Sequence, residues 1–213
     1  MIKSSKGTLL IIDGPNGAGK TTVCELLQKA IENSIYLREP GSLEQCEAIR
    51  KVIFHYKADL DLTTQYHLFQ AARHELFIKA IFPALDEGKT VILDRSVLST
   101  IVYQKSFKKP IEEFNALLSM YDKPFNCMMY FIYAPYNILL DRIKQRNLTN
   151  HPFEEGLAET SSNYIKAYKL LSVGNFLKFP IKSIVNKQSS NTVKRIIRIT
   201  NTEFGGDLIE RRN

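Results

Sequence analysis

A glycine-rich segment is the part of the sequence whose residue types most directly indicate chemistry. Residues 14–21 read GPNGAGKT and match GxxxxGK[ST], the pattern of a phosphate-binding loop. Its glycines let successive backbone N–H groups point into one concavity, and a following helix adds positive charge. Lys20 is placed to reach the β- and γ-phosphates, and the Thr21 hydroxyl to bind Mg²⁺. The expected triphosphate site comprises Gly14, Asn16, Gly17, Ala18, Gly19, Lys20, Thr21 and Thr22.

A carboxylate and an arginine follow an apolar run farther along the chain. Residues 90–93 read TVIL, typical of a buried parallel strand, and Asp94 and Arg95 come directly after them. At the carboxyl end of a parallel strand, such side chains face the ligand crevice of an α/β sheet. We therefore expect Asp94 to complete the Mg²⁺ site begun by Thr21, and Arg95 to bind a phosphate. The alternative is a salt-bridging pair on the surface.

Both groups of residues require strands that run in one direction. Apolar runs predict strands at 8–12, 34–37, 90–93, 127–133 and 180–185. Helical spacing predicts helices at 20–32, 41–55, 63–87, 97–107, 136–146, 153–171 and 192–200, with a bend or break at Pro83 in the third. This alternation indicates an α/β fold, a doubly wound and mainly parallel five-stranded sheet flanked by helices. Together with the phosphate-binding loop, it is a fold of the P-loop NTPase type.

Length, charge and cysteine content define the broad class of protein. The 213 residues favour one domain, residues 1–213, and the net charge of +7, from 29 Lys and Arg against 22 Asp and Glu, suits a phosphate-binding protein. The 44% hydrophobic content excludes a disordered or coiled-coil chain. No apolar run is long enough for a membrane span, and no signal peptide is expected. Three cysteines without a CxxC pair argue against disulfides or zinc, so we expect a cytoplasmic location.

Four further segments resemble the thymidylate kinase family of P-loop nucleoside monophosphate kinases. They are REPG at 38–41, Arg50, LFQAARH at 68–74 and DRSVLSTIVYQ at 94–104. In that family the second strand ends in REPG, a further Arg follows at the spacing of Arg50, and the motifs LFxAxR and DRxxxSTxxYQ come next. The resemblance runs from about residue 9 to residue 104 and is weaker after that.

The resemblance implies that ATP and a deoxynucleoside monophosphate share one crevice. It implies that Phe69 stacks on the acceptor base and that Arg73 donates to a ring carbonyl; as residues i and i+4 they share one helix face. Arg50 and Arg95 match arginines that bind the acceptor phosphate, and Tyr103 matches a residue that crowds the ribose 2′ position. Ordinary core or helix packing is the alternative for Phe69 and Tyr103. The acceptor site implied in full is Glu39, Pro40, Arg50, Phe69, Arg73, Arg95, Ser99, Thr100, Tyr103, Gln104 and Tyr164.

A lid over the donor phosphates is expected at about residues 142–155. Arg142 and Arg146 lie four residues apart on one face of a predicted helix, so both are expected to bind the donor phosphates. Two solvated helix charges are the alternative. Residues 151–152, His-Pro, stand where the family often has an Arg, so the lid departs from the family pattern.

Two other positions also depart from the family. Asn16 stands where an acidic residue is often found, and Ser96 replaces an aromatic residue or His. Either difference can alter metal coordination or the choice of base. The expected catalytic residues are Lys20, Asp94, Arg95, Arg142 and Arg146, and the expected metal ligands are Thr21 and Asp94.

The resemblance implies an enzyme that transfers the γ-phosphoryl group of ATP, with Mg²⁺, to a deoxynucleoside monophosphate, dTMP to dTDP. It also implies a homodimer, and neither a nucleic acid nor a membrane is expected as a partner. One alternative is a deoxynucleoside kinase in which Glu39 deprotonates a 5′-hydroxyl, although an arginine at the position of Arg50 would then have no phosphate to bind. The others are a kinase of several deoxynucleoside monophosphates, a nucleic-acid-handling protein that uses ATP as a switch, and a fold that has lost catalysis.

Overall fold

A sheet of five parallel strands forms the middle layer of the protein. The computed structural model describes residues 6–56, 59–145 and 156–205. The strands are β1 (Thr8–Asp13), β2 (Ser34–Arg38), β3 (Thr90–Asp94), β4 (Asn126–Tyr133) and β5 (Ile181–Val185), in the order β2-β3-β1-β4-β5. The strand pairings are parallel throughout, which confirms the predicted sheet and the place of each of its strands.

The strand order reverses at β1. This strand pairs with β3 on one side, where Ile12 lies opposite Asp94, and with β4 on the other, where Asp13 lies opposite Phe131. In an open α/β sheet, ligands bind outside the carboxyl ends of the strands at such a point. The loop that follows β1 and the residues that follow β3 therefore meet at one edge of the sheet.

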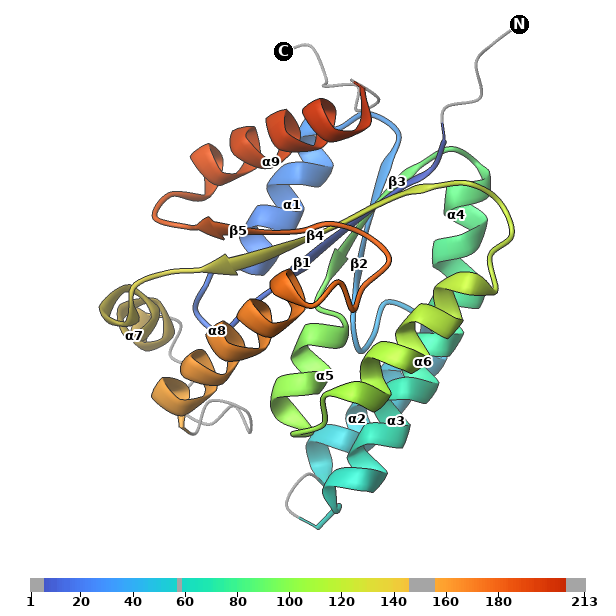
Figure 1. Ribbon diagram of the computed structural model, residues 1–213. Coiled ribbons are helices and arrows are strands. Elements are labelled where there is room, and N and C mark those ends of the chain that lie inside the picture. The colour runs from blue at the N-terminus through green and yellow to red at the C-terminus, as the bar shows by residue number, and fades with distance from the viewer. Residues whose placement is uncertain (1–5, 57–58, 146–155, 206–213) are drawn as a thin grey trace, which may run out of the picture.

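Helices cover both faces of the sheet (Figure 1). They are α1 (Lys20–Ala30), α2 (Glu44–His55), α3 (Leu62–Leu76), α4 (Phe82–Asp86), α5 (Val97–Tyr103), α6 (Lys108–Ser119), α7 (Tyr136–Gln145), α8 (Leu157–Val173) and α9 (Ser189–Phe204). Leu9 and Ile11 of β1 are buried in a core that includes residues of α3, α5, α6 and α8. Leu10 and Ile12 are buried in a second core, with α1, α7 and α9. No helix among the described residues is long and apolar enough to cross a membrane.

The predicted helix 63–87 is divided in the structure. α3 is followed by a π-helical turn, η1 (Phe77–Ile81), and then by α4, in which Pro83 lies in the first turn. Proline has no N–H and its ring clashes with the carbonyl four residues earlier, so a regular α-helix does not continue through it.

One helix, α6, was not predicted. Its buried residues Ile111, Phe114, Leu117 and Leu118 have the spacing of an amphipathic helix, so the signal was present in the sequence. Several helix boundaries also differ from the prediction by a few residues. α5 ends at Tyr103 rather than residue 107, and α9 begins at Ser189 rather than residue 192.

Candidate active site

The phosphate-binding loop connects β1 to α1 as the sequence predicts. Gly14 has φ 151°, and a Cβ built on it would lie 2.0 Å from the carbonyl oxygen of Ile132 in β4. Only glycine therefore permits this close approach of the loop to the sheet. α1 begins at Lys20, so its first N–H groups are directed at the loop concavity.

Lys20 is folded back onto its own loop. Its Nζ donates to the carbonyl oxygen of Pro15 at 2.8 Å, and the side chain is almost completely buried. Burial, with the nearby positive charge of Arg95, lowers the pKa of Lys20 to about 7, although Asp94 and Asp13 oppose the shift. An anionic ligand in the loop would favour the charged form of this amine.

Asp13, which sequence analysis missed, joins the phosphate-binding loop to the start of α5. The carboxylate is fully buried and accepts the backbone N–H of Gly14 at 2.7 Å. It also accepts the N–H groups of Ser96 and Ser99, both at 2.9 Å, and the Ser99 hydroxyl at 2.7 Å. An acidic residue at the end of β1 is a signal for such a role, because carboxylate oxygens can accept several N–H groups at once.

Asp94 and Thr21 lie together, as predicted for a metal site. Oδ2 of Asp94 accepts the Thr21 hydroxyl at 2.7 Å and, unexpectedly, the hydroxyl of Tyr36 from β2 at 3.2 Å. The other oxygen, Oδ1, is buried and has no hydrogen-bond partner among the described residues. A buried, unpartnered carboxylate oxygen beside a hydroxyl is the hard oxygen donor set that Mg²⁺ prefers. The residues present therefore fit this metal.

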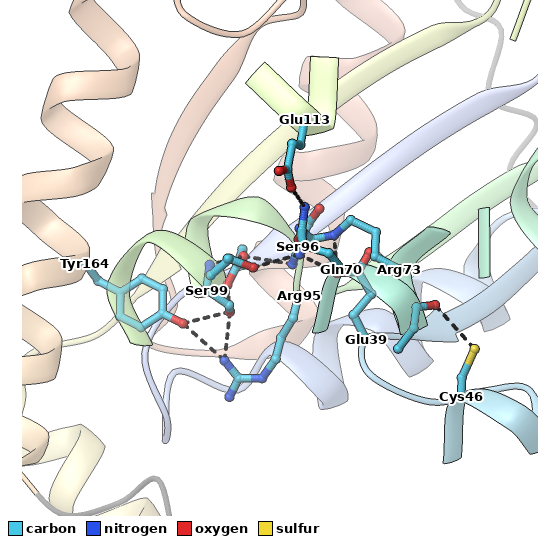
Figure 2. A network of polar contacts seen from close by, with 12 residues as sticks. Glu39, Cys46, Gln70, Arg73, Arg95, Ser96, Ser99, Glu113 and Tyr164 are labelled. Carbon is cyan, nitrogen blue, oxygen red and sulfur yellow. Dashed lines mark hydrogen bonds and ion pairs between the residues drawn. The ribbon is translucent and has the colours of Figure 1, made fainter. Parts of the chain in front are cut away.

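Arg95 forms its side-chain hydrogen bonds with neutral side chains. Its NH1 donates to the hydroxyls of Ser99 at 3.1 Å and of Tyr164 from α8 at 3.2 Å (Figure 2). Its NH2 donates to Oδ1 of Asn16. None of the described residues forms an ion pair with this guanidinium. Its positive charge is therefore available to an anion. Arg95 also has φ 73°, a left-handed backbone conformation that is unfavourable for residues with a Cβ.

Arg73, in contrast to Arg95, forms an ion pair with a buried carboxylate. Its Nε donates to Oε2 of Glu39 at 2.9 Å, and its NH2 forms an ion pair with the same oxygen at 2.8 Å (Figure 2). Both side chains are buried. NH2 also donates to the Thr100 hydroxyl at 2.9 Å. Burial raises the pKa of Glu39, and Arg73 opposes the shift. The charge of Arg73 is thus largely neutralised by Glu39, which precedes Pro40 in a cis peptide bond.

Arg50 lies beside the same segment. Its NH1 donates to the carbonyl oxygen of Pro40 at 3.2 Å, and its guanidinium lies over the ring of Phe54, 4.7 Å from the centroid. Glu47 is 3.8 Å from Arg50 but is bound more closely by Arg38, at 3.0 Å. Glu47 therefore neutralises the positive charge of Arg50 only in part at this side of the crevice.

These groups border one cavity of about 200 Å³. The predicted residues that line it are Asn16, Gly17, Gly19, Lys20, Thr21, Glu39, Pro40, Arg50, Phe69, Arg73, Asp94, Arg95, Ser99, Thr100, Tyr103 and Gln104. Arg38, Phe54 and Ser96 line it as well and were not predicted as site residues. The predicted residues Gly14, Ala18, Thr22, Arg142 and Tyr164 are not among its lining. Phe69 and Arg73 thus face the same cavity, as their helical spacing predicts.

Arg142 binds backbone rather than facing the cavity. Its guanidinium donates to the carbonyl oxygens of Gly17 and Ala18, at 3.3 and 3.4 Å, and of Asn186 and Lys187, both at 3.1 Å. The buried Asn186 amide, which was also missed, donates to Ala18 at 2.7 Å. These bonds attach α7 and the segment after β5 to the phosphate-binding loop. Arg146 and the rest of the expected lid, residues 146–155, lie outside the described residues.

Known proteins match this chain over most of its length. A family model described as thymidylate kinase matches residues 12–189. The thymidylate kinase of Buchnera aphidicola is 38% identical over 151 residues, which are 67% of this chain and 71% of that protein. The thymidylate kinase of Chlorobium limicola is 34% identical over 147 residues, or 66% of this chain and 67% of that protein.

Solved structures share the fold. The thymidylate kinase of Ehrlichia chaffeensis has a TM-score of 0.63 at 22% identity, covering 91% of this chain and 98% of that chain. The thymidylate kinase of Candida albicans has a TM-score of 0.69 at 21% identity, covering 97% and 96%. Since the family model spans most of the sequence and these two relatives match it over about two thirds of their length, the chain belongs to the thymidylate kinase family and is a nucleoside monophosphate kinase.

Proposed function

We propose that the cavity binds dTMP as the phosphoryl acceptor and that ATP, with Mg²⁺, is the donor, giving dTDP and ADP. The observation that carries the proposal is the different pairing of two arginines in one cavity. Buried Glu39 neutralises Arg73, whereas Arg95 donates only to neutral side chains. A base is neutral and a phosphate is anionic, so Arg73 suits the base and Arg95 suits the acceptor phosphate.

The acceptor site is assigned from the same lining residues. The ring of Phe69 offers a flat apolar face on which a pyrimidine can stack, next to the donor groups of Arg73. Arg50, held over Phe54, adds a second cation for the acceptor phosphate. Tyr103 and Gln104 complete the wall and are assigned to the sugar and the base edge.

The donor site is assigned to the phosphate-binding loop. Its backbone N–H groups and the start of α1 would surround the donor phosphates, while Lys20 would exchange the Pro15 carbonyl for phosphate oxygens. Arg142 and Asn186 hold the outer side of the loop in place. Because the acceptor phosphate oxygen is already an anion, the reaction requires positioning and charge neutralisation rather than a general base.

Mg²⁺ would be held by the Thr21 hydroxyl and by Oδ1 of Asp94. When bound, it supplies charge neutralisation at the β- and γ-phosphate oxygens. Tyr36 and Thr21, which both donate to Oδ2, orient the Asp94 carboxylate in the ligand-free protein.

We also propose that residues 1–213 form one kinase domain, and that the protein acts in the cytoplasm as a homodimer. Three large apolar side chains near the end of α2 and the start of α3 are exposed, Val52 at 42%, Tyr56 at 49% and Leu62 at 44%. This apolar surface supports association through these helices. Sedimentation equilibrium tests the dimer, and a monomer at micromolar concentration would contradict it.

A parallel assay of ADP release tests the proposed reaction. The protein is given ATP and Mg²⁺ with dTMP, dUMP, dCMP, dAMP, dGMP or thymidine, each in turn. Turnover confined to dTMP and dUMP is the expected result, because thymine and uracil present an acceptor oxygen to Arg73 where cytosine presents an amino group. Turnover of several monophosphates would identify a broader kinase, and turnover of thymidine alone would identify a nucleoside kinase instead.

A further inference from the structure

A chain of hydrogen bonds links Arg73 to a residue outside the cavity. NH1 of Arg73 donates to Oε1 of Gln70, one turn earlier in α3, and Nε2 of Gln70 donates to Oε2 of Glu113 in α6 at 2.7 Å (Figure 2). The Tyr66 hydroxyl donates to the same oxygen of Glu113. Neither Gln70 nor Glu113 lines the cavity, so any effect they have on a ligand passes through Arg73.

The two ends of this chain fix the orientation of the Gln70 amide. An ionised carboxylate can only accept hydrogen bonds, and a guanidinium can only donate them. Gln70 must therefore present its NH₂ group to Glu113 and its oxygen to Arg73. Without the carboxylate at residue 113, the amide could rotate and present N–H groups to the guanidinium, which cannot accept them.

The contacts of Arg73 leave a defined donor for a ligand. Of its five N–H hydrogens, the contacts among the described residues use Nε and NH2 for Glu39, NH2 for Thr100 and NH1 for Gln70. One hydrogen on NH1 is left, and Arg73 lines the cavity. The direction of that hydrogen depends on how Gln70 holds the same nitrogen.

We propose that Glu113, acting through Gln70, positions the Arg73 guanidinium and so determines how strictly the site selects its base. The proposal rests on the proposed function, in which Arg73 donates to the base. Thymine presents an acceptor oxygen where cytosine presents an amino donor. A guanidinium N–H that is held in one direction therefore favours thymine over cytosine. An N–H that is free to turn away distinguishes the two bases less well.

The first test compares variants of Glu113 in steady-state kinetics with dTMP and dCMP. Glu113→Ala is expected to raise KM for dTMP about tenfold, the effect of losing one hydrogen bond to a charged group, with a smaller change in kcat. The preference for dTMP over dCMP in kcat/KM should fall by a similar factor. Glu113→Gln keeps an acceptor oxygen and should retain most of the preference. Glu112→Ala, the same change at the exposed neighbouring position, is the matched control.

The second test separates action through Gln70 from simple packing of α6 on α3. In a Gln70→Ala background, Glu113→Ala should add little to KM, because the link is already removed. An equal effect of Glu113→Ala in both backgrounds, or an unchanged preference for dTMP, would overturn the proposal. Tyr66→Phe removes the other hydrogen-bond donor to Oε2 of Glu113 and should leave the preference intact.

A third measurement does not depend on turnover. In the nucleotide-free protein, the side-chain Nε–H resonance of Arg73 in ¹⁵N spectra should shift and exchange faster with solvent in Glu113→Ala but not in Glu112→Ala. An unmoved resonance would contradict the positioning role whatever the substrate. If the wild type failed to phosphorylate dTMP, the proposed function would fall, while this resonance would still decide whether Glu113 holds Arg73.

Discussion

Oε2 of Glu39 accepts the Nε–H of Arg73 at 2.9 Å and lies 2.8 Å from its NH2 in an ion pair, with only 6% of the Glu39 side chain and 3% of the Arg73 side chain exposed. Arg95, across the same cavity, donates only to neutral oxygens among the described residues. The resemblance to the family implies different roles for the two arginines, the base for Arg73 and the acceptor phosphate for Arg95, but not the partners that distinguish them. Their partners make one end of the cavity nearly neutral and leave the other positive, which complements the neutral base and the anionic phosphate of a nucleoside monophosphate.

Removing Glu39 should destabilise the protein strongly. Glu39→Ala leaves the Arg73 charge buried without its partner, so the free energy of unfolding should fall by about 3–5 kcal/mol. Urea unfolding of the nucleotide-free protein measures it. The double variant Glu39→Leu with Arg73→Leu buries no charge and should lose less than Glu39→Ala. A loss below about 1 kcal/mol for Glu39→Ala would mean that water reaches Arg73 readily.

Substitutions of Arg95 should separate activity from stability. Arg95→Ala and Arg95→Gly both remove the guanidinium, and each should lower kcat/KM for dTMP by about a hundredfold or more. Residue 95 has φ 73°, so Gly relieves a strain that Ala keeps, and Arg95→Gly should be about 1 kcal/mol more stable than Arg95→Ala. Kinetics and urea unfolding of the pair test both statements. Wild-type turnover in either variant would refute the role assigned to Arg95.

The sheet and the phosphate-binding loop were predictable because their signals are local. The apolar run before Asp13 and the glycines after it place a strand and a loop within a few residues of each other. The i and i+4 spacing of Phe69 and Arg73 likewise predicted that both face one cavity.

What the sequence did not reveal depends on contacts between distant segments. The hydroxyl of Tyr36 meets Asp94 only because β2 pairs with β3, and Glu113 meets Gln70 only because α6 packs beside α3. Arg142 was expected at the donor phosphates. In the described structure it donates instead to the backbone carbonyls of Gly17, Ala18, Asn186 and Lys187. Periodicity shows which face of a helix is buried but does not identify the side chain that it meets.

The ionisation of Lys20 should make nucleotide binding take up a proton. Its pKa of about 7 leaves the amine mostly neutral at pH 8, and an anionic triphosphate would restore the charged form. Calorimetry of ATP binding at pH 8, in buffers of different ionisation enthalpy, should show uptake close to one proton. At pH 6 the uptake at this residue should be small because the amine is already mostly charged.

Two checks accompany that calorimetry. Lys20→Arg keeps a permanent charge and should abolish the proton uptake at pH 8. The folded pKa of Lys20 also lies below its ordinary value of 10.5, so the unfolded chain binds more protons between about pH 7 and 10.5. The nucleotide-free wild type should therefore gain stability relative to Lys20→Met as pH rises through this range, by up to about 1.4 kcal/mol per pH unit. A stability difference between the two proteins that does not change with pH would contradict the lowered pKa of Lys20.

The pairing of Thr21 with Asp94 predicts which substitutions weaken metal binding. Asp94→Asn removes the charge of the carboxylate whose Oδ1 has no partner among the described residues, so the Mg²⁺ concentration for half-maximal ATP binding should rise by about tenfold or more. Thr21→Val loses the hydroxyl and should also raise it, whereas Thr21→Ser keeps the hydroxyl and should not. Fluorescence titration of a labelled ATP analogue with Mg²⁺ measures the effect without turnover.

Tyr36→Phe is the matched control for this metal prediction. It removes one hydrogen bond to Oδ2 at 3.2 Å but leaves the charge of Asp94 and the Thr21 contact in place. Its Mg²⁺ requirement should change by about threefold or less, because only the orientation of the carboxylate is affected. Equal shifts in Tyr36→Phe and Asp94→Asn would mean that the orientation of Asp94, rather than its charge, governs Mg²⁺ binding.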